Sequence, residues 1–189
     1  MVNFTVLYDA CLFYPAPLRD LMVRLAQTRQ FRARWSVEIH REWVNALLRN
    51  QPALDRLRLE RTVSLLNQAV PDCLVTDYEH LIAHLELPDP NVRHVLAAAI
   101  YSGAQAIVTL NLKDFPREQL DGFGIVARHP DDFVLDLAGL EPGSVITVAK
   151  QQRAALKQPP FMPEAFVDCL RRQGLPGVAA FLDDAINLI

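Results

Sequence analysis

The segment from Asp89 to Pro116 constrains the fold most strongly, because it predicts a helix followed at once by a buried strand. Its sequence is DPNVRHVLAAAIYSGAQAIVTLNLKDFP. Asp89-Pro90 is a typical helix start, with Asp as the N-cap and Pro in the first turn, and Gly103 is placed to end the helix. The run Ala106–Leu110 carries no charge. Such a run is typical of a strand in a parallel sheet that helices cover on both faces.

Two further runs of strand character, Val2–Tyr8 and Ile125–Ala127, are separated from Ala106–Leu110 by helical patterns. We expect helices at about 18–28, 36–51, 55–69 and 78–85, and a short strand at 73–75. Phe31–Trp35 is expected to be a short connection. Strands that alternate with helices predict right-handed crossovers, and therefore an α/β fold, a three-layer α/β/α sandwich with a central parallel sheet.

From about Glu141 the chain changes character. Prolines separate three short helical patterns, at Pro142, Pro159, Pro160, Pro163 and Pro176. We therefore expect two parts, an α/β domain over residues 1–139 and a helical C-terminal extension over residues 140–189. The extension is expected to pack on the core or on a partner.

The composition is that of a globular protein with a sizeable core, because 51% of the 189 residues are hydrophobic. No apolar run approaches the ~20 residues of a membrane span, and the first residues do not resemble a signal peptide. The three cysteines, Cys11, Cys73 and Cys169, are scattered and have no metal-type spacing. We expect reduced thiols and a cytoplasmic protein.

The charge is unevenly spread along the chain, although the net charge is only −3. The first 70 residues hold ten Arg, no Lys and six acidic residues, and the remainder is strongly acidic. A basic half fits a protein that meets phosphate on one side. The alternative is that these arginines only solvate helix faces.

Four acidic residues are expected near the same edge of the sheet: Asp9, Glu42, Asp89 and Asp114. Asp9 and Asp114 follow strands, and the carboxyl ends of parallel strands form one ligand-binding edge. Glu42 borders the apolar stripe of its helix. Converging carboxylates suit Mg²⁺ or Mn²⁺, which can activate water and stabilise charge on a phosphoryl oxygen. Taken singly, each of the four could be a cap, turn or solvated residue, so the prediction rests on their joint placement.

Arg93 and His94 begin the helix beside this edge, so they could contact phosphate or simply lie on a solvated helix surface. The five histidines show no zinc-type spacing. No Gly-rich phosphate loop is present in the sequence, which disfavours an NTPase.

Three blocks of the sequence resemble one known family. They are VLYDAC at 6–11, RWS through EW at 34–43, and the block 89–116 with its RHVLAAA and VTLNLKDFP motifs. Over about residues 3–135 the chain resembles the PIN-domain ribonucleases, which include the VapC-type toxins.

This resemblance implies a PIN-like α/β/α fold and Mg²⁺- or Mn²⁺-dependent endonucleolytic cleavage of RNA. It also implies a cognate antitoxin protein and a homodimer. Carried over by position, the acidic set is Asp9, Glu42, Asp89 and Asp114, with Asp9, Asp89 and Asp114 as metal ligands. Thr109 and Asn111 match the polar residues that line the pocket.

The leading hypothesis is a metal-dependent endoribonuclease that acts as the toxin of a type II toxin–antitoxin system. A second hypothesis is a PIN-like scaffold with a degraded pocket that binds RNA or protein. It is favoured by Val92 and Asn111, which stand where many relatives carry Asp. A third is a structure-specific DNA nuclease.

Overall fold

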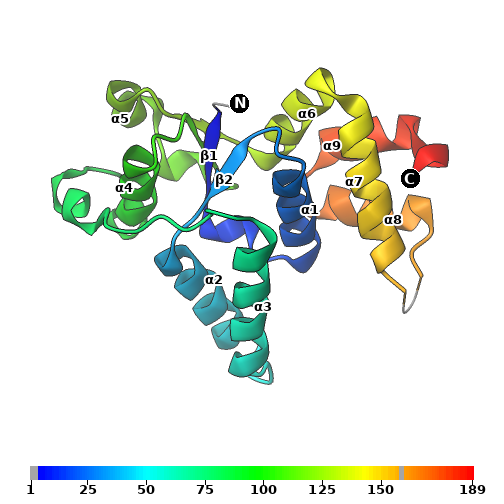
Figure 1. Ribbon diagram of the computed structural model, residues 1–189, viewed down its shortest axis with the longest axis horizontal. Coiled ribbons are helices and arrows are strands. Elements are labelled where there is room, and N and C mark those ends of the chain that lie inside the picture. Colours follow the sequence, from blue (N-terminus) through cyan, green and yellow to red (C-terminus); the bar gives the residue numbers. More distant parts are fainter. Residues whose placement is uncertain (1–3, 158–159) are drawn as a thin grey trace.

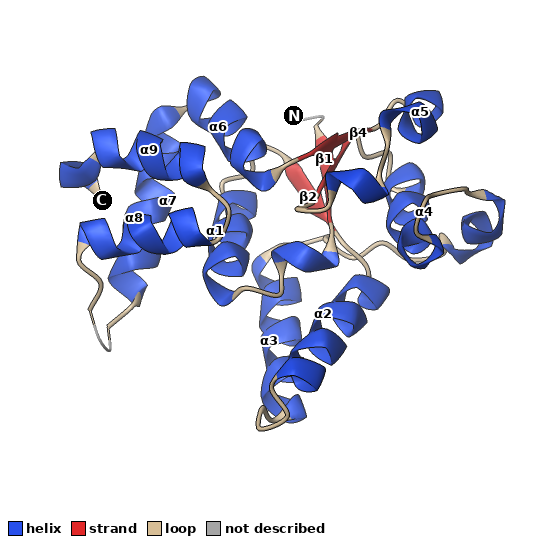
Figure 2. Cartoon of the chain, turned by 180° about the vertical axis from the view of Figure 1, so that it is seen from behind, coloured by secondary structure: helices blue, strands red, loops and turns tan. Residues whose placement is uncertain are grey.

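Four short parallel strands form one sheet at the centre of the molecule, with helices on both sides (Figures 1 and 2). The computed structural model describes residues 4–157 and 160–189. In spatial order the strands are β2 (Arg32–Arg34), β1 (Thr5–Tyr8), β3 (Ala106–Val108) and β4 (Val126–Arg128). Leu7 of β1 pairs with Arg34 on one side and with Ile107 on the other. The predicted α/β/α fold with a central parallel sheet is confirmed.

Two helices cover opposite faces of this sheet. Figures 1 and 2 show α1 (Ala16–Gln27) on one side of the strands and α4 (Arg93–Tyr101) on the other. Residues 94–99 of α4 are all buried, and three of them are alanines. Small side chains allow this helix to lie close to β1 and β3, which it contacts. The short helix α5 (Arg117–Leu120) lies next to β4.

The helices α2 (Val37–Asn50) and α3 (Arg56–Ala69) pack on each other and project from the sheet as an arm at the bottom of Figure 1. Ser36 is the N-cap of α2, as predicted, and its Oγ accepts a hydrogen bond from the N–H of Ile39 at 3.2 Å. The predicted inward stripe of α2 is buried, namely Ile39, Trp43 and Leu47.

One predicted connection is wrong, because the segment 31–35 contains the edge strand β2. Its residues alternate between exposed Arg32, buried Ala33 and half-buried Arg34. Charged residues are common on edge strands, and here they concealed the strand in the sequence. The region expected as a strand at 73–75 makes a single bridge between Leu74 and Trp35.

Several turns are 3-10 helices, including the short helix expected at 78–85. They are η1 (Ala10–Leu12), η2 (Glu79–His84), η3 (Pro90–Val92), η4 (Leu112–Asp114), η5 (Asp121–Phe123) and η6 (Ile186–Leu188). The first two residues of the predicted strand Val2–Tyr8, and Pro159, lie outside the described residues. In the described part of the chain, no helix is long and apolar enough to cross a membrane.

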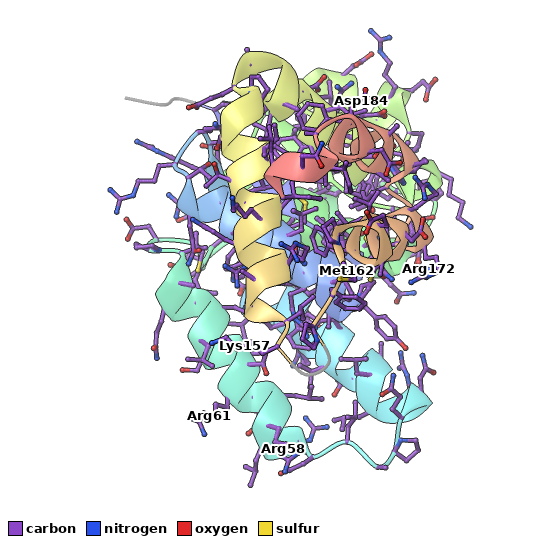
Figure 3. All side chains as sticks on the ribbon, turned by 90° about the vertical axis from the view of Figure 1, so that its right-hand side faces the viewer. Arg58, Arg61, Lys157, Met162, Arg172 and Asp184 are labelled. Carbon is purple, nitrogen blue, oxygen red and sulfur yellow. The ribbon has the colours of Figure 1, made fainter. Side chains whose placement is uncertain are left out.

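Four helices follow the sheet and gather on one side of it (Figure 1). They are α6 (Pro130–Leu140), α7 (Pro142–Ala155), α8 (Pro163–Arg172) and α9 (Pro176–Asp184). Each begins with proline, whose fixed φ suits the first helical turn. Figure 3 shows α8 and α9 one above the other beside α7. Because α6 packs on α7 and α9, and α7 packs on α1, these helices lie against the α/β core.

A buried carboxylate joins two of these helices. Asp131, in the first turn of α6, accepts hydrogen bonds from the N–H groups of Gly177 and Val178, both at 2.8 Å. These N–H groups belong to the first turn of α9, where no earlier carbonyl can accept from them. Asp131 therefore caps α9 from a neighbouring helix.

Both tryptophans of the chain are buried in one aromatic cluster beneath the carboxyl end of β1. Phe13 lies between them, with ring centroids 5.3 Å from Trp35 and 6.4 Å from Trp43. Tyr8 stacks on Trp35 at 6.0 Å. The guanidinium of Arg19 lies 5.0 Å from the centre of the Trp43 ring. This cluster supports the segment that follows β1.

Candidate active site

Asp9 stands immediately after β1, as the N-cap of η1, and its side chain is almost fully buried. Its Oδ1 accepts a hydrogen bond from the N–H of Ala10 at 2.7 Å. Its Oδ2 accepts hydrogen bonds from Thr109 Oγ1 at 2.7 Å and from Cys11 Sγ at 3.2 Å. A buried carboxylate with three donors is fixed in position and supported as an anion.

Thr109 and Cys11 also connect Asp9 to the segment that follows β3. Thr109 Oγ1 accepts a hydrogen bond from the N–H of Asn111 at 3.0 Å, and Cys11 Sγ accepts one from the N–H of Leu110 at 3.2 Å. The ends of β1 and β3 are thus tied together around one carboxylate. The structure places Thr109 against Asp9, and its predicted role in substrate binding stays a prediction.

The pKa of Asp9 is raised above its ordinary value of 3.8, mainly because burial penalises the charged form. The hydrogen bonds from Thr109, Cys11 and Ala10 oppose this and lower the pKa. The negative charge of Glu42 raises it further. The two carboxylates therefore repel each other, although this repulsion raises the pKa less than burial does, and a bound cation would relieve it.

Glu42 is held by a histidine from the opposite helix. Glu42 lies on α2, and its Oε1 is 2.9 Å from Nε2 of His94, in the first turn of α4. His94 is buried, and its Nδ1 has no hydrogen-bond partner among the described residues. With Nε2 as the donor, the imidazole of His94 fixes the position of one carboxylate oxygen of Glu42.

Glu42 opens onto a groove of about 650 Å³ between the arm and the strand ends. The groove is lined by Ala10, Cys11, Tyr14, Pro15, Glu42, Trp43, Asn45, Ala46, Arg49, Asn91 and Leu110. Its polar side chains include two amides and one guanidinium, which can donate hydrogen bonds to an anionic ligand. The groove therefore combines the carboxylate of Glu42 with the hydrogen-bond donors of Asn45, Arg49 and Asn91.

The remaining predicted residues are not among those that line the groove. Asp89 caps η3, and its Oδ1 accepts hydrogen bonds from the backbone and side-chain amides of Asn91, both at 2.9 Å. Asp114 is half-buried on η4, which the exposed Asn111 precedes. Arg93 begins α4. Substrate contacts by Arg93 and Asn111 stay predictions, as do the metal-binding roles of Asp89 and Asp114.

The described residues fit a divalent cation held by few protein ligands. Within 4–157 and 160–189, no three His, Cys, Asp or Glu side chains are grouped closely enough to hold a metal ion. Asp9 and Glu42 nevertheless form an electrostatically coupled pair of hard oxygen donors. Mg²⁺ commonly binds through one or two carboxylates, with water and substrate phosphate completing its shell. The pair therefore suits this type of site better than an all-protein cage.

Two features of the site were missed by reasoning from sequence. Cys11 was expected to be an ordinary thiol, yet it is a hydrogen-bond donor to Asp9. His94 was expected either to contact phosphate or to lie on a solvated helix surface, yet it is buried against Glu42. A substrate contact by His94 stays a prediction, and its position near the start of the apolar helix was the one sequence signal that placed it by the site.

Comparisons with known proteins agree with this fold. A family model described as PIN domain matches residues 4–113, and one described as VapC50 C-terminal domain matches residues 130–184. A protein of Mycobacterium tuberculosis (strain ATCC 25618 / H37Rv), named "Putative ribonuclease VapC50", is 39% identical over 127 residues, which are 65% of this chain and 74% of the relative. No solved structure matches significantly. The chain therefore belongs to the PIN-domain family, as its motifs predicted.

Proposed function

We propose that this protein is a metal-dependent endoribonuclease that acts as the toxin of a type II toxin–antitoxin system. The observation that carries the proposal is the buried Asp9 at the end of β1, whose pKa the charge of Glu42 raises. The similarity to a protein named as a ribonuclease and the PIN-domain match support the reaction class. The resemblance to VapC-type toxins supports a cognate antitoxin, a homodimer and a cytoplasmic location.

The roles of the residues follow from their contacts. Asp9 and Glu42 would hold Mg²⁺ or Mn²⁺, and the resemblance adds Asp89 and Asp114 to the acidic set. A bound ion would supply Lewis acidity and lower the pKa of a water for hydrolysis of a phosphodiester bond. Thr109 and Cys11 hold the Asp9 carboxylate in position, and His94 holds that of Glu42.

The RNA backbone enters along the groove wall. Arg49 and Asn91 line the groove and can donate hydrogen bonds to phosphate oxygens. Arg93 and Asn111 are the further residues that we assign to substrate binding. The open groove suits a single-stranded or looped RNA, because unpaired bases can turn away from the backbone.

The experiment compares RNA cleavage by the wild type and by Asp9→Asn, with Mg²⁺, with Mn²⁺ and with a chelator. We expect cleavage by the wild type only, and only with metal. Equal cleavage by both proteins would exclude Asp9 from the reaction, and preferential cleavage of DNA would assign a different substrate. Expression of the wild type, but not of Asp9→Asn, should arrest cell growth if the protein is a toxin.

A second candidate function is an RNA- or protein-binding scaffold without catalysis. It is favoured by the lack of a three-residue metal cluster within the described ranges. Titration with Mn²⁺ separates the two candidates. A scaffold would bind RNA with the same affinity with and without metal and would leave it intact.

A further inference from the structure

A second groove lies along the free edge of β2, the edge that does not pair with β1. We call it the β2-edge groove, and its volume is about 850 Å³. It is lined by Ala26, Gln27, Arg29, Phe31, Arg32, Ala33, Arg34, Gln68, Ala69, Val70, Pro71 and Asp72. None of these residues lines the active-site groove. Figure 1 shows β2 in the foreground, with α1 beside it and α3 below it.

Three arginines give the β2-edge groove a positive charge. Arg29 and Arg32 are exposed, and neither forms an ion pair in the described part of the chain. The guanidinium of Arg34 donates a hydrogen bond to the backbone oxygen of Asp72. Asp72 is the single carboxylate among the lining residues. The groove therefore holds a net positive charge that its own side chains do not neutralise.

The strand edge adds a backbone donor to these side chains. Arg32 donates its N–H inward to Phe4 at 2.8 Å, whereas Trp35 donates outward to the carbonyl of Cys73 at 2.9 Å. Successive residues of a strand direct their N–H groups to alternate sides, so the N–H of Ala33 is directed outward like that of Trp35. The segment 73–75 pairs only at Trp35. The N–H of Ala33 thus faces the β2-edge groove.

A hydrogen bond and buried apolar residues hold the walls of the β2-edge groove in place. Gln27 Nε2 donates a hydrogen bond to the carbonyl of Ala69 at 3.4 Å, which joins α1 to the end of α3. Phe31 and Val70 are buried and form an apolar floor. Arg29 and Asp72 have φ angles of 60° and 57°, a conformation that side-chain-bearing residues rarely adopt and that concentrates at functional sites.

From these features we propose that the β2-edge groove is a second binding site for single-stranded RNA, separate from the active site. Guanidinium groups and a backbone N–H bind the phosphates, and Gln27 and Gln68 offer amides to base edges. The apolar floor receives part of a base. This site rests on the proposed function, because it holds the same substrate that the active site cuts.

The β2-edge groove lies close enough to serve one RNA strand together with the active site. Arg32 pairs with Thr5, which is four residues before Asp9. At about 3.3 Å per residue, this pairing lies about 13 Å from Asp9 along the strand direction. A single strand of several nucleotides that passes the edge of β2 could therefore contact both sites.

The experiment measures binding of a fluorescein-labelled single-stranded RNA by anisotropy over a series of salt concentrations. All proteins carry Asp9→Asn so that the RNA stays intact. The test variant is Arg29→Gln/Arg32→Gln, because both side chains are exposed and neither forms an ion pair in the described part of the chain. The matched control is Arg58→Gln/Arg61→Gln, which removes the same charge from α3, where both side chains extend into solvent (Figure 3).

We expect the test variant to bind RNA about 10-fold or more weakly at low salt. The slope of log affinity against log salt should become shallower by about 1.4, which is about 0.7 for each lost phosphate contact. The control should bind like the parent protein. Unchanged melting temperatures establish that both variants are folded. A photocrosslink from 4-thiouridine RNA to the segment 29–34 would locate the contact directly.

Three outcomes overturn the second site. They are unchanged affinity of the test variant, an equal loss in the control, and an equal loss of affinity for polyglutamate, which would assign the groove to an acidic polypeptide. The readout is independent of cleavage. If the protein with Asp9 intact does not cut RNA but binds it through Arg29 and Arg32, the proposed function fails and the second site stands.

Discussion

Nε2 of His94 lies 2.9 Å from Oε1 of Glu42, which lines the active-site groove, and this contact joins α4 to α2. Glu42 and His94 are separated by 51 intervening residues along the chain. The contact fixes the position of Glu42 relative to Asp9. It therefore influences the distance between the two carboxylates that we propose as metal ligands.

Replacing His94 should weaken metal binding without unfolding the protein. In His94→Leu the carboxylate of Glu42 loses its donor and can rotate, so we expect cleavage to fall by about 10–100-fold. His94→Gln can still donate to Glu42 and should retain more activity. The measurements are cleavage rate and metal affinity by calorimetry. His84→Gln, on an exposed histidine, is the control, and wild-type metal affinity in His94→Leu would contradict the positioning role.

Asp9→Asn should change stability in a pH-dependent way. Because burial raises the pKa of Asp9, the folded chain retains that proton to higher pH than the unfolded chain. Its contribution to stability is complete below the unfolded pKa and is lost as pH rises through the folded pKa. Asn does not titrate, so the melting temperature of Asp9→Asn relative to wild type should increase from acidic to alkaline buffer. A constant difference would contradict the raised pKa.

Thr109→Val should shift the pH dependence of cleavage. The substitution keeps the shape but removes the donor to Asp9 and the acceptor for the N–H of Asn111, at a cost of about 1–3 kcal/mol in stability. Since the Thr109 hydroxyl lowers the pKa of Asp9, its loss raises that pKa. The acid limb of the rate profile should therefore move to higher pH. Thr109→Ser, which keeps the hydroxyl, should leave the limb in place.

Gly177→Ala should destabilise the C-terminal helices. A Cβ at Gly177 would lie 2.6 Å from Leu135 Cδ1 and 2.9 Å from Asp131 Oδ2, so Asp131 would have to release α9. We expect a loss of about 1–3 kcal/mol in the free energy of unfolding. Gly143→Ala is the matched control, because its Cβ meets nothing within 4 Å and alanine favours the helix by up to about 1 kcal/mol. Equal stability of the two variants would rule out the cap.

The fold could be predicted from sequence because apolar runs and helix-capping residues indicate its central strands and helices. The uncharged run at 106–110 predicted a covered strand, and β3 is present there. The helix expected to start at Asp89-Pro90 begins only at Arg93, because Asp89 caps the short helix η3 instead. The edge strand β2 was missed because an edge strand has no need of an apolar run. Arg32 and Arg34 are charged, whereas a central strand is typically apolar. Local pattern therefore predicts central strands better than edges.

The candidate site was predicted unevenly for a similar reason. Asp9 and Thr109 are fixed by the ends of adjacent strands, which topology places together. The contact between Glu42 and His94 depends on how α2 and α4 approach each other, and nothing local encodes that approach. The capping role considered for Asp89 is present in the structure. Whether Asp89 and Asp114 also hold metal stays a prediction.

The aromatic cluster gives this protein an internal optical probe. Trp35 and Trp43 are its two fluorophores of longest wavelength, and both are shielded from water in the folded state. Trp35→Phe would leave Trp43 as a single emitter next to Glu42, with the guanidinium of Arg19 over its ring. Filling of the groove could then be followed in real time by emission intensity, without attaching a dye to the protein.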